Sequence, residues 1–244
     1  MNTITLKEDP VGQSTLAIIS SAAAFNRWMY DEIKPYLHGR VLELGSGTGN
    51  ISNWVLKDRF ETVLSDYNPG YTHYLEETFK TYPNLQAVLQ LDLQAPAFEH
   101  ENAALSEKFD SIFLLNVIEH LENDAAAVSN CKFLLKPGGQ LVLLAPAYHF
   151  LYCNLDRNLG HYRRYTSSSL ADLLKINGLM LTEKKYFNLA GIPGWLLWGK
   201  LFRAKQLQAG SMKVFNRLVP LFRLADKITG RKMGLSAIAA GKKL

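Results

Sequence analysis

The sequence predicts an α/β fold in which a parallel sheet is covered by helices on both faces. Short apolar segments, such as 61–66 and 109–116, alternate along the chain with segments of helical periodicity, a pattern typical of such folds. A glycine-rich turn follows the first apolar segment. The 244 residues suffice for one large domain, so length alone requires no second one.

That glycine-rich turn is the most informative feature of the chain. Residues 41–44 have the apolar character of a buried strand, and Gly45, Gly47 and Gly49 follow them. Glycine has no Cβ atom, so the backbone of such a turn can approach a ligand closely. A dinucleotide site needs the spacing G-x-G-x-x-G, but Asn50 occupies the sixth place. A nicotinamide oxidoreductase is therefore the weaker interpretation, and a turn that serves only packing is another alternative.

The residue before the turn favours a cationic ligand. Glu43 would repel a pyrophosphate, whereas it suits a ligand that carries a positive charge. Together with Gly45, Gly47 and Gly49 it resembles the motif E/D-x-G-x-G-x-G of the class I S-adenosylmethionine-dependent methyltransferases. The resemblance implies S-adenosylmethionine as the cofactor and a Rossmann-like, seven-stranded methyltransferase sheet with helices on both faces. It also implies an amino-terminal cover helix and a helical insertion before the last strand.

Carboxylates follow the next two predicted strands. Asp66 ends the segment 61–66, about twenty residues after the turn, where a carboxylate can accept hydrogen bonds from both ribose hydroxyls. Asp92 follows the segment 85–91, and the resemblance makes it the acceptor for the adenine amino group. The resemblance also assigns the segment 116–120 to the adenine and methionine parts. The predicted cofactor-binding residues are Glu43, Gly45, Ser46, Gly47, Gly49, Asp66, Tyr67, Asp92, Leu93, Asn116 and Val117.

The remaining elements follow from periodicity and from residues that begin or end helices. Pro137 and two glycines after it end a helix, Thr166 is a good N-cap and Gly178 a good stop. The resemblance makes the last two strands an antiparallel edge. Helices are predicted over 16–37, 70–82, 122–135 and 167–176, and later strands over 140–145, 179–188 and 235–240.

The connection 148–166 is long for an α/β loop, which typically has about 2–6 residues. It follows the fifth predicted strand, so it should lie near the methyl group of the cofactor. Its end, 159–166, resembles a G-H-x-R-R-Y segment of bacterial methyltransferases that are often grouped with glycan and cell-surface polysaccharide enzymes. This resemblance suggests a glycan-related acceptor.

Two histidines are candidates for the general base. His161 in this connection is preferred, because an imidazole has an ordinary pKa near neutrality, although a structural role is equally compatible with the sequence. His120 is the competitor, and its expected role is to line the cofactor site. Cys131 and Cys153 show no metal-ligand spacing, so no metal site is expected.

Adjacent arginines suggest recognition of an anionic acceptor. Arg163 and Arg164 offer guanidinium groups that bind phosphate or carboxylate, and one of the two is expected to face the pocket while the other packs or pairs. Anchoring of the loop is the alternative role. The predicted acceptor-binding residues are Tyr148, Arg163, Arg164, Tyr165, Asn188 and Trp195.

Charge is distributed unevenly along the chain. Residues 1–150 carry 10 Lys or Arg and 18 Asp or Glu, whereas residues 151–244 carry 17 and 4. The basic part contains the insertion 190–232, whose helices combine Trp and Phe with Lys200, Arg203, Lys213, Arg217, Arg223 and Lys227. Such helices can lie on an anionic membrane, or they can pack an apolar face over the acceptor pocket, which is the preferred interpretation.

The chain is interpreted as one domain. Its predicted parts are the cover helices 1–38, the cofactor-binding core 39–189, the helical lid 190–232 and the last strand 233–244. No signal peptide and no membrane span is predicted, so the expected location is cytoplasmic, with peripheral membrane contact as a further hypothesis.

The predicted function is O-methylation of a sugar, a glycan-linked group or a related polar small molecule. N- or O-methylation of a secondary metabolite and non-catalytic binding of S-adenosylmethionine are the alternatives. Nucleic acid is an unlikely acceptor because no N/D-P-P-Y/F motif and no RNA-binding module is present.

Overall fold

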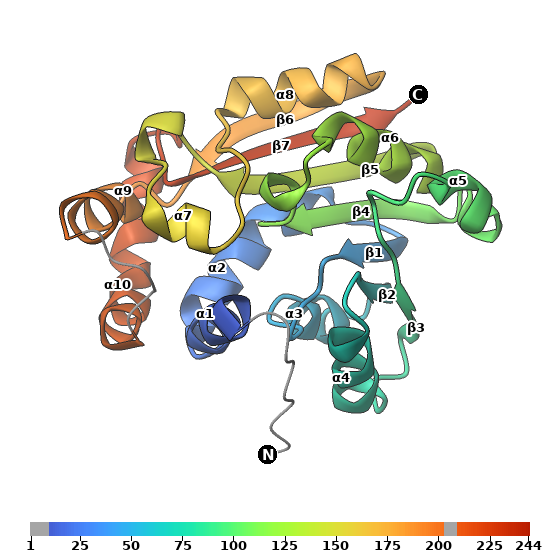
Figure 1. The fold of residues 1–244 in the computed structure, drawn as a ribbon, viewed down its shortest axis with the longest axis horizontal. Coiled ribbons are helices and arrows are strands. Elements are labelled where there is room, and N and C mark those ends of the chain that lie inside the picture. Colours follow the sequence, from blue (N-terminus) through green and yellow to red (C-terminus); the bar gives the residue numbers. More distant parts are fainter. Residues whose placement is uncertain (1–9, 203–208) are drawn as a thin grey trace.

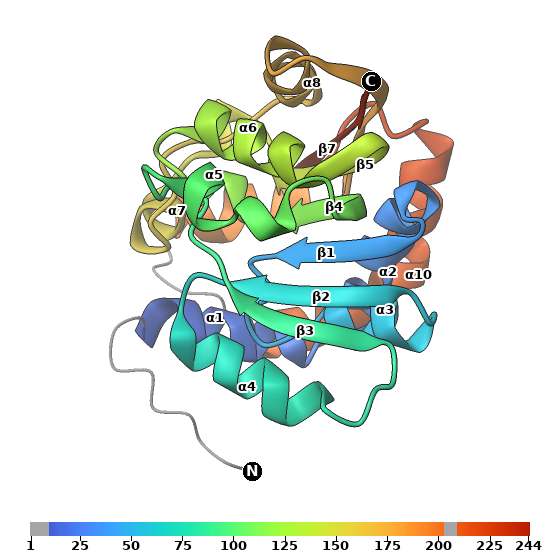
Figure 2. The ribbon, with the colours of Figure 1, turned by 90° about the vertical axis from the view of Figure 1, so that its right-hand side faces the viewer.

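The computed structural model describes residues 10–202 and 209–244 and contains a seven-stranded sheet. The strand order is β3-β2-β1-β4-β5-β7-β6, and the first five strands in this order are parallel (Figures 1 and 2). β7 is antiparallel to both of its neighbours, which confirms the predicted antiparallel edge. The strands are β1 (Arg40–Leu44), β2 (Glu61–Asp66), β3 (Leu85–Gln90), β4 (Phe109–Leu115), β5 (Leu135–Pro146), β6 (Leu179–Phe187) and β7 (Ser236–Lys243).

Helices cover both faces of the sheet, as predicted. The α-helices of the described residues are α1 (Pro10–Ser20), α2 (Ala23–Ile33), α3 (Ser52–Lys57), α4 (Pro69–Phe79), α5 (Phe98–Glu101), α6 (Asp124–Leu134), α7 (Asn154–Asn158), α8 (Ser167–Ile176), α9 (Gly191–Trp195) and α10 (Ala209–Ile228). Short 3₁₀ turns are η1 (Lys34–Tyr36), η2 (Ala103–Leu105), η3 (Ile118–His120) and η4 (His149–Leu151). A π-helical segment, η5 (Leu196–Leu201), continues α9.

Two large apolar cores lie on opposite faces of the sheet, and alternate side chains of the central strands belong to one or the other. Leu42 of β1 packs in the core that includes residues of α5, α6 and α8, whereas its neighbour Val41 packs in the core of α2, α3 and α10. Successive side chains of a strand point to opposite faces, so a doubly covered strand must be apolar at nearly every position. β1 has two charged residues: Arg40 begins the strand, and Glu43 lies in its second half, close to the glycine turn.

Most predicted boundaries agree with the structure to within three residues, and two elements differ more. The predicted strand 140–145 begins earlier, at Leu135, because residues after α6 are already extended and Leu135 pairs with Phe109. The predicted helix 16–37 corresponds to two helices, since the helical conformation is interrupted between Ser20 and Ala23. The hydroxyl of Ser20 donates to the carbonyl of Ala17, a local bond that competes with continuation of the helix.

The insertion between β6 and β7 is helical, as predicted, and its long helix α10 packs on α2. Phe215 contacts Phe25 of α2 edge to face, with ring centroids 5.5 Å apart. Arg223 forms an ion pair with Asp31 at 2.8 Å. In Figure 1, α7, α9 and α10 lie together at one side of the molecule. Arg203, one of the basic residues noted in the sequence, lies outside the described residues.

Candidate active site

The glycine turn that follows β1 requires glycine at its strained positions. Gly45, Gly47 and Gly49 all have positive φ angles, of +74°, +54° and +76°. A Cβ atom on Gly45 would lie 2.4 Å from a methyl group of Val117, and one on Gly49 would lie 2.3 Å from the ring of Phe79. The turn is therefore compact as well as left-handed, and its backbone is fixed at the carboxyl end of β1.

Asp66 at the end of β2 braces the turn from the neighbouring strand. The backbone N–H of Gly47 donates to its Oδ2 at 2.9 Å, and that of Asn68 donates to Oδ1 at 3.0 Å. Burial raises the pKa of Asp66 despite these bonds. The backbone of Tyr67 also donates to this carboxylate, so Asp66 is bound by the backbone of three residues and its contact with the ribose hydroxyls stays a prediction.

Glu43 is buried beneath the turn. Its Oε2 accepts a hydrogen bond of 2.5 Å from the hydroxyl of Ser52 in α3. Burial raises the pKa of Glu43 to about 8, although hydrogen bonds from Ser52 and Ser46 oppose the shift. The structure thus gives this carboxylate a role in holding the turn on α3, and its contact with the amino group of the cofactor stays a prediction.

The other predicted cofactor residues lie along the same edge of the sheet. The N–H of Leu91 donates to the carbonyl of Asp66, so the segment that contains Asp92 and Leu93 runs beside the end of β2. The side chain of Tyr67 is 64% exposed, and Asp92 is also exposed. Asn116 follows β4 with a φ of +54° and is exposed as well. Polar groups from β1, β2, β3 and β4 therefore converge beside a glycine cradle, an arrangement that fits S-adenosylmethionine.

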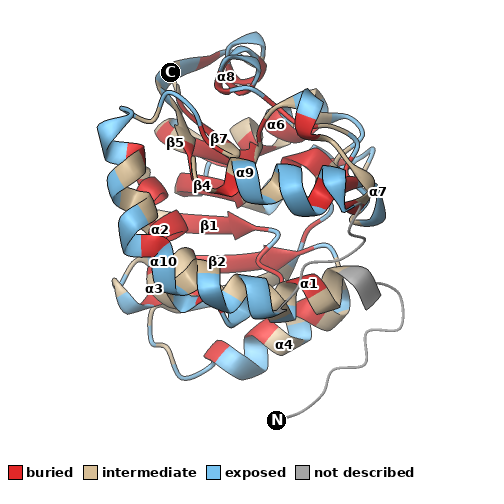
Figure 3. Ribbon diagram, turned by 90° about the vertical axis from the view of Figure 1, so that its left-hand side faces the viewer, coloured by how far each residue is buried: buried red, intermediate tan, exposed pale blue. Residues whose placement is uncertain are grey.

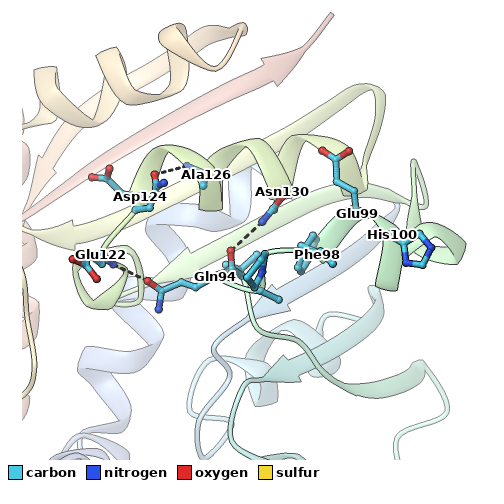
Figure 4. A pocket seen from close by; sticks show the side chains of 13 residues that line it. Gln94, Phe98, Glu99, His100, Glu122, Asp124, Ala126 and Asn130 are labelled. Carbon is cyan, nitrogen blue, oxygen red and sulfur yellow. Dashed lines mark hydrogen bonds between the residues drawn. The ribbon is translucent and has the colours of Figure 1, made fainter.

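A hollow of about 1110 Å³ lies next to this edge, between the segment after β3 and the start of α6 (Figure 4). Gln94 accepts a hydrogen bond from the N–H of Glu122 across it, and Asn130 donates to the carbonyl of Leu93. Leu93 is the only predicted cofactor residue among those that line the hollow. The hollow is therefore separate from the glycine turn and does not define the cofactor site.

The long connection after β5 is organised by a buried ion pair. Arg164, with a side chain only 1% exposed, donates two hydrogen bonds to Asp156, at 2.7 and 3.1 Å. The guanidinium group also lies over the ring of Trp195 of α9, 4.5 Å from its centroid. The connection and the insertion are thus tied together at this pair.

Both predicted arginines are engaged within the protein. Arg163 pairs with Asp124 at 3.0 Å and donates to the carbonyl of Glu122 at 2.7 Å. Arg164 is bound to Asp156, as described above. Both arginines thus have acidic partners on neighbouring segments, which fits the alternative role of anchoring the loop, and contact of Arg163 or Arg164 with an acceptor stays a prediction.

His161 is oriented by the same aspartate. Its Nδ1 lies 2.9 Å from Oδ1 of Asp156, which leaves Nε2 as the other ring nitrogen. Although burial alone would raise it, hydrogen bonds from His161 and Arg164 hold the pKa of Asp156 below its usual value. An imidazole with one nitrogen fixed on a carboxylate is the arrangement of a positioned base.

His120 and Glu119 lie beside His161. The two imidazole rings are perpendicular, with centroids 4.6 Å apart. Burial, and in smaller measure the neighbouring His161, lowers the pKa of His120 to about 4, so its ring is neutral near pH 7. The carboxylate of Glu119 is fully buried. Sequence reasoning missed Glu119 and Asp156, because neither follows a strand or belongs to a recognisable spacing.

Three further residues predicted to bind the acceptor stabilise the surrounding backbone. The hydroxyl of Tyr165 donates to Asp124 at 2.7 Å, and the indole of Trp195 donates to the carbonyl of Leu151 at 3.1 Å. Asn188 is buried and accepts a hydrogen bond from the N–H of Gly191. Their polar groups are thus used inside the protein. Acceptor contact by these residues stays a prediction that would rest on their apolar surfaces.

Tyr148, the remaining predicted acceptor residue, belongs to a row of stacked rings. Its ring stacks on Phe150, with centroids 5.4 Å apart, and on Tyr186, with centroids 5.1 Å apart. Phe150 is 59% exposed. The row gives the carboxyl end of β5 an exposed aromatic surface.

The strand order and the glycine turn define the class of the protein: a class I S-adenosylmethionine-dependent methyltransferase. The chain belongs to the methyltransferase domain family, whose model matches residues 24–184. The fold, the enzyme class and S-adenosylmethionine as the cofactor are thereby confirmed, whereas the G-H-x-R-R-Y resemblance is not.

Known proteins resemble this chain over different extents. A highly reducing polyketide synthase of Pyrenophora dematioidea is 31% identical over 117 residues, which are 43% of this chain and 4% of that protein. The solved carbon methyltransferase CurJ has a TM-score of 0.57 at 16% identity, covering 91% of this chain and 53% of that one. Phosphoethanolamine N-methyltransferase 2 of Haemonchus contortus, in complex with S-adenosyl-L-methionine, has a TM-score of 0.61 at 14% identity. That match covers 100% of this chain and 60% of the other, and likenesses at such identities concern the fold alone.

Proposed function

We propose that this methyltransferase acts on a hydroxyl group of a sugar, a glycan-linked molecule or a related polar small molecule. The observation that carries the proposal is the Asp156–His161 pair in the connection after β5. A hydroxyl must lose its proton when the oxygen is methylated, whereas a neutral amine needs no such assistance before the transfer. A histidine fixed by a buried carboxylate is suited to an acceptor that has a proton to lose.

The surroundings of this pair support a cyclic polar acceptor. The stacked rings of Tyr148 and Phe150 offer an apolar face of the kind on which a sugar ring can lie. S-adenosylmethionine supplies an electrophilic methyl group when it is bound. The chain has to hold the acceptor oxygen about 3–3.5 Å from that group and in line with it.

A carbon acceptor is the second candidate. Polyketide synthases and a carbon methyltransferase are among the proteins that this chain resembles, and a carbon acid also needs a base. The Asp156–His161 pair would serve that reaction equally well. The two candidates differ in the atom that becomes methylated, which an experiment can identify.

The test is methyl transfer from S-adenosylmethionine with a ¹³C-labelled methyl group to sugars, nucleotide sugars and β-keto thioesters, with products examined by NMR. An O-methyl signal on a sugar is the expected result. Asp66→Ala should weaken cofactor binding by about 2 kcal/mol and serves as the cofactor-deficient control. A carbon-bound methyl on a thioester would favour the second candidate, and cofactor binding without turnover of any of these acceptors would count against both candidates.

The outer face of α10 carries exposed apolar side chains, which suggest a surface at which the protein meets its acceptor. Val214, Leu218, Leu221 and Ile228 are exposed although they are apolar, and their spacing places them on one side of the helix. The opposite, inner stripe includes Phe215 and packs on α2. In Figure 3 the outer surfaces of α9 and α10 are largely exposed. The helix therefore has a second apolar stripe that nothing in the described residues covers.

We propose that this outer stripe and η5 rest on an anionic membrane surface. Leu201 and Phe202 at the end of η5 are exposed, and the rings of Trp198 and Phe202 contact each other at an angle of 42°, with centroids 5.2 Å apart. The exposed cations Lys200, Lys213, Arg217 and Lys227 lie on the same two helices. Apolar and aromatic side chains flanked by cations are typical of helices that lie in a membrane interface. No helix among the described residues is long and apolar enough to cross a bilayer.

Co-sedimentation with liposomes tests this surface. We expect binding to vesicles that contain phosphatidylserine but not to phosphatidylcholine alone, with release as salt is added, because salt screens the attraction. Replacing Lys213, Arg217 and Lys227 with Gln should abolish sedimentation. Arg223 is left intact because it pairs with Asp31.

The matched control removes the same charge from other surfaces. Lys80, Lys108 and Lys175 are exposed, and their replacement with Gln should leave sedimentation unchanged. If both triple variants lost sedimentation equally, the net charge of the protein and not this particular surface would explain the binding. If the unaltered protein does not sediment with these vesicles at low salt, the membrane proposal fails and the helices are interpreted as a packed lid.

A further inference from the structure

Three potential metal ligands converge at the carboxyl end of β4. Glu119 and His120 come from η3, and His161 comes from the connection before α8. One ligand atom of each lies within 4.8 Å of the others. The N–H of Tyr162 donates to the carbonyl of Glu119 at 2.8 Å, so the two segments are joined next to the cluster. The cluster is therefore held by backbone contacts.

The carboxylate of Glu119 is the unusual member. Its side chain is fully buried, and neither of its oxygens has a hydrogen-bond partner among the described residues. An ionised carboxylate in this position is very costly unless a cation or a proton accompanies it. Asp156 and Arg164 bind each other, so Arg164 is not available as a full counter-ion for Glu119.

Both histidines have the outer contacts of metal ligands. Asp156 holds Nδ1 of His161, and the carbonyl of Leu159 accepts a hydrogen bond from the ring of His120. Histidines that bind metals usually donate their other ring N–H to a carboxylate or a carbonyl, which orients the free nitrogen toward the ion. His161 has the carboxylate partner, and His120 has the carbonyl partner.

We infer that Glu119, His120 and His161 bind a divalent transition-metal ion. Two imidazoles and one carboxylate match the ligands of Zn²⁺ or Mn²⁺, whereas Mg²⁺ and Ca²⁺ prefer oxygen alone. Three protein ligands leave at least one coordination position open, as in catalytic zinc sites. The spacing of Cys131 and Cys153 predicts no metal site, but these three ligands are not cysteines. The cluster joins residues about forty positions apart and becomes visible only in the folded chain.

Such an ion would refine the role of His161, and this consequence rests on the proposed function. An acceptor hydroxyl bound at the open position would be acidified by the ion and would release its proton to solvent. In that case the Nε2 lone pair of His161 binds the ion instead of removing the proton itself. The Asp156–His161 pair is needed in both cases.

Titration of the purified, metal-free protein with ZnCl₂, MnCl₂ and MgCl₂ by calorimetry tests the inference. We expect one equivalent of Zn²⁺ or Mn²⁺ to bind and Mg²⁺ to bind at least 100-fold more weakly. Co²⁺ should produce visible absorption bands of a nitrogen- and oxygen-ligated ion, a readout that needs neither a variant nor methyl transfer. Failure to find an acceptor would thus overturn the proposed function but leave the metal site standing.

Variants assign the binding to these residues. Glu119→Gln, which preserves shape, and His120→Ala should each weaken Zn²⁺ binding at least 100-fold while the circular dichroism spectrum is retained. His73→Ala on α4 removes an exposed histidine and should bind like the unaltered protein. The inference would be overturned if the unaltered protein bound no stoichiometric Zn²⁺, or if both cluster variants bound Zn²⁺ as tightly as the unaltered protein.

Discussion

Asp156→Ala is expected to destabilise the protein by about 3–5 kcal/mol, the range for a buried ion pair that loses one partner. Arg164 would retain its charge in a site where its side chain is 1% exposed, and His161 would lose the acceptor at Nδ1. The contribution of Asp156 should be present above the ordinary aspartate pKa of about 3.9 and should vanish as the pH falls through the lower pKa of the folded protein. Urea unfolding at several pH values, followed by circular dichroism, measures both effects.

Asp172 provides the matched control. It pairs with Lys175 at 3.3 Å on the surface of α8, where both side chains are more than half exposed. Exposed pairs of this kind contribute about 0–1 kcal/mol, so Asp172→Ala should change the free energy of unfolding very little. If Asp156→Ala were as mild as Asp172→Ala, the ion pair would not organise the connection after β5.

His161→Ala is expected to lower kcat by about 10²–10⁴, with the affinity for S-adenosylmethionine preserved. The side chain lies in the connection after β5, apart from the glycine turn and Asp66, so cofactor binding should not depend on it. Asp156 and Arg164 remain paired in this variant, which should keep the fold intact. Steady-state transfer rates and calorimetric cofactor binding separate the two quantities.

His149→Ala is the control within the same connection, because His149 is exposed and does not belong to the Glu119–His120–His161 cluster. Its rate should stay close to that of the unaltered protein. A change of less than tenfold in His161→Ala would assign His161 to loop structure. The loss of rate by itself does not distinguish removal of a proton from binding of an ion, and the metal titrations distinguish these roles.

Local patterns in the chain are sufficient to predict the sheet, the glycine turn and the positions of the acidic residues after the strands. Gly45, Gly47 and Gly49 are separated by single residues, and a left-handed turn of this kind is determined by which residues lack a Cβ atom. Asp66 and Asp92 directly follow strands, and the carboxyl ends of parallel strands share one edge. The helical insertion was likewise visible as apolar periodicity between two predicted strands.

The features that the sequence could not predict depend on residues that are distant from each other in the chain. Whether Arg163 faces a ligand or an acidic neighbour depends on where Asp124 lies, and those residues are brought together only when α6 packs beside the connection after β5. For the same reason the inner and outer stripes of α10 were indistinguishable, since both are apolar at helical spacing and only the position of α2 decides which one is buried.

The sequence by itself determined the α/β fold, the glycine turn and the carboxylates at the strand ends, because each depends on the conformation of a few consecutive residues or on simple periodicity. The tertiary structure decided the contacts of the connection after β5. Asp156 orients His161, the ring of His120 lies perpendicular to that of His161, and the carboxylate of Glu119 has no hydrogen-bond partner in the part of the chain that the structure describes. These relations join irregular segments, in which no periodicity links a residue to its neighbours in space, so only the packing of the complete sheet and its loops establishes them.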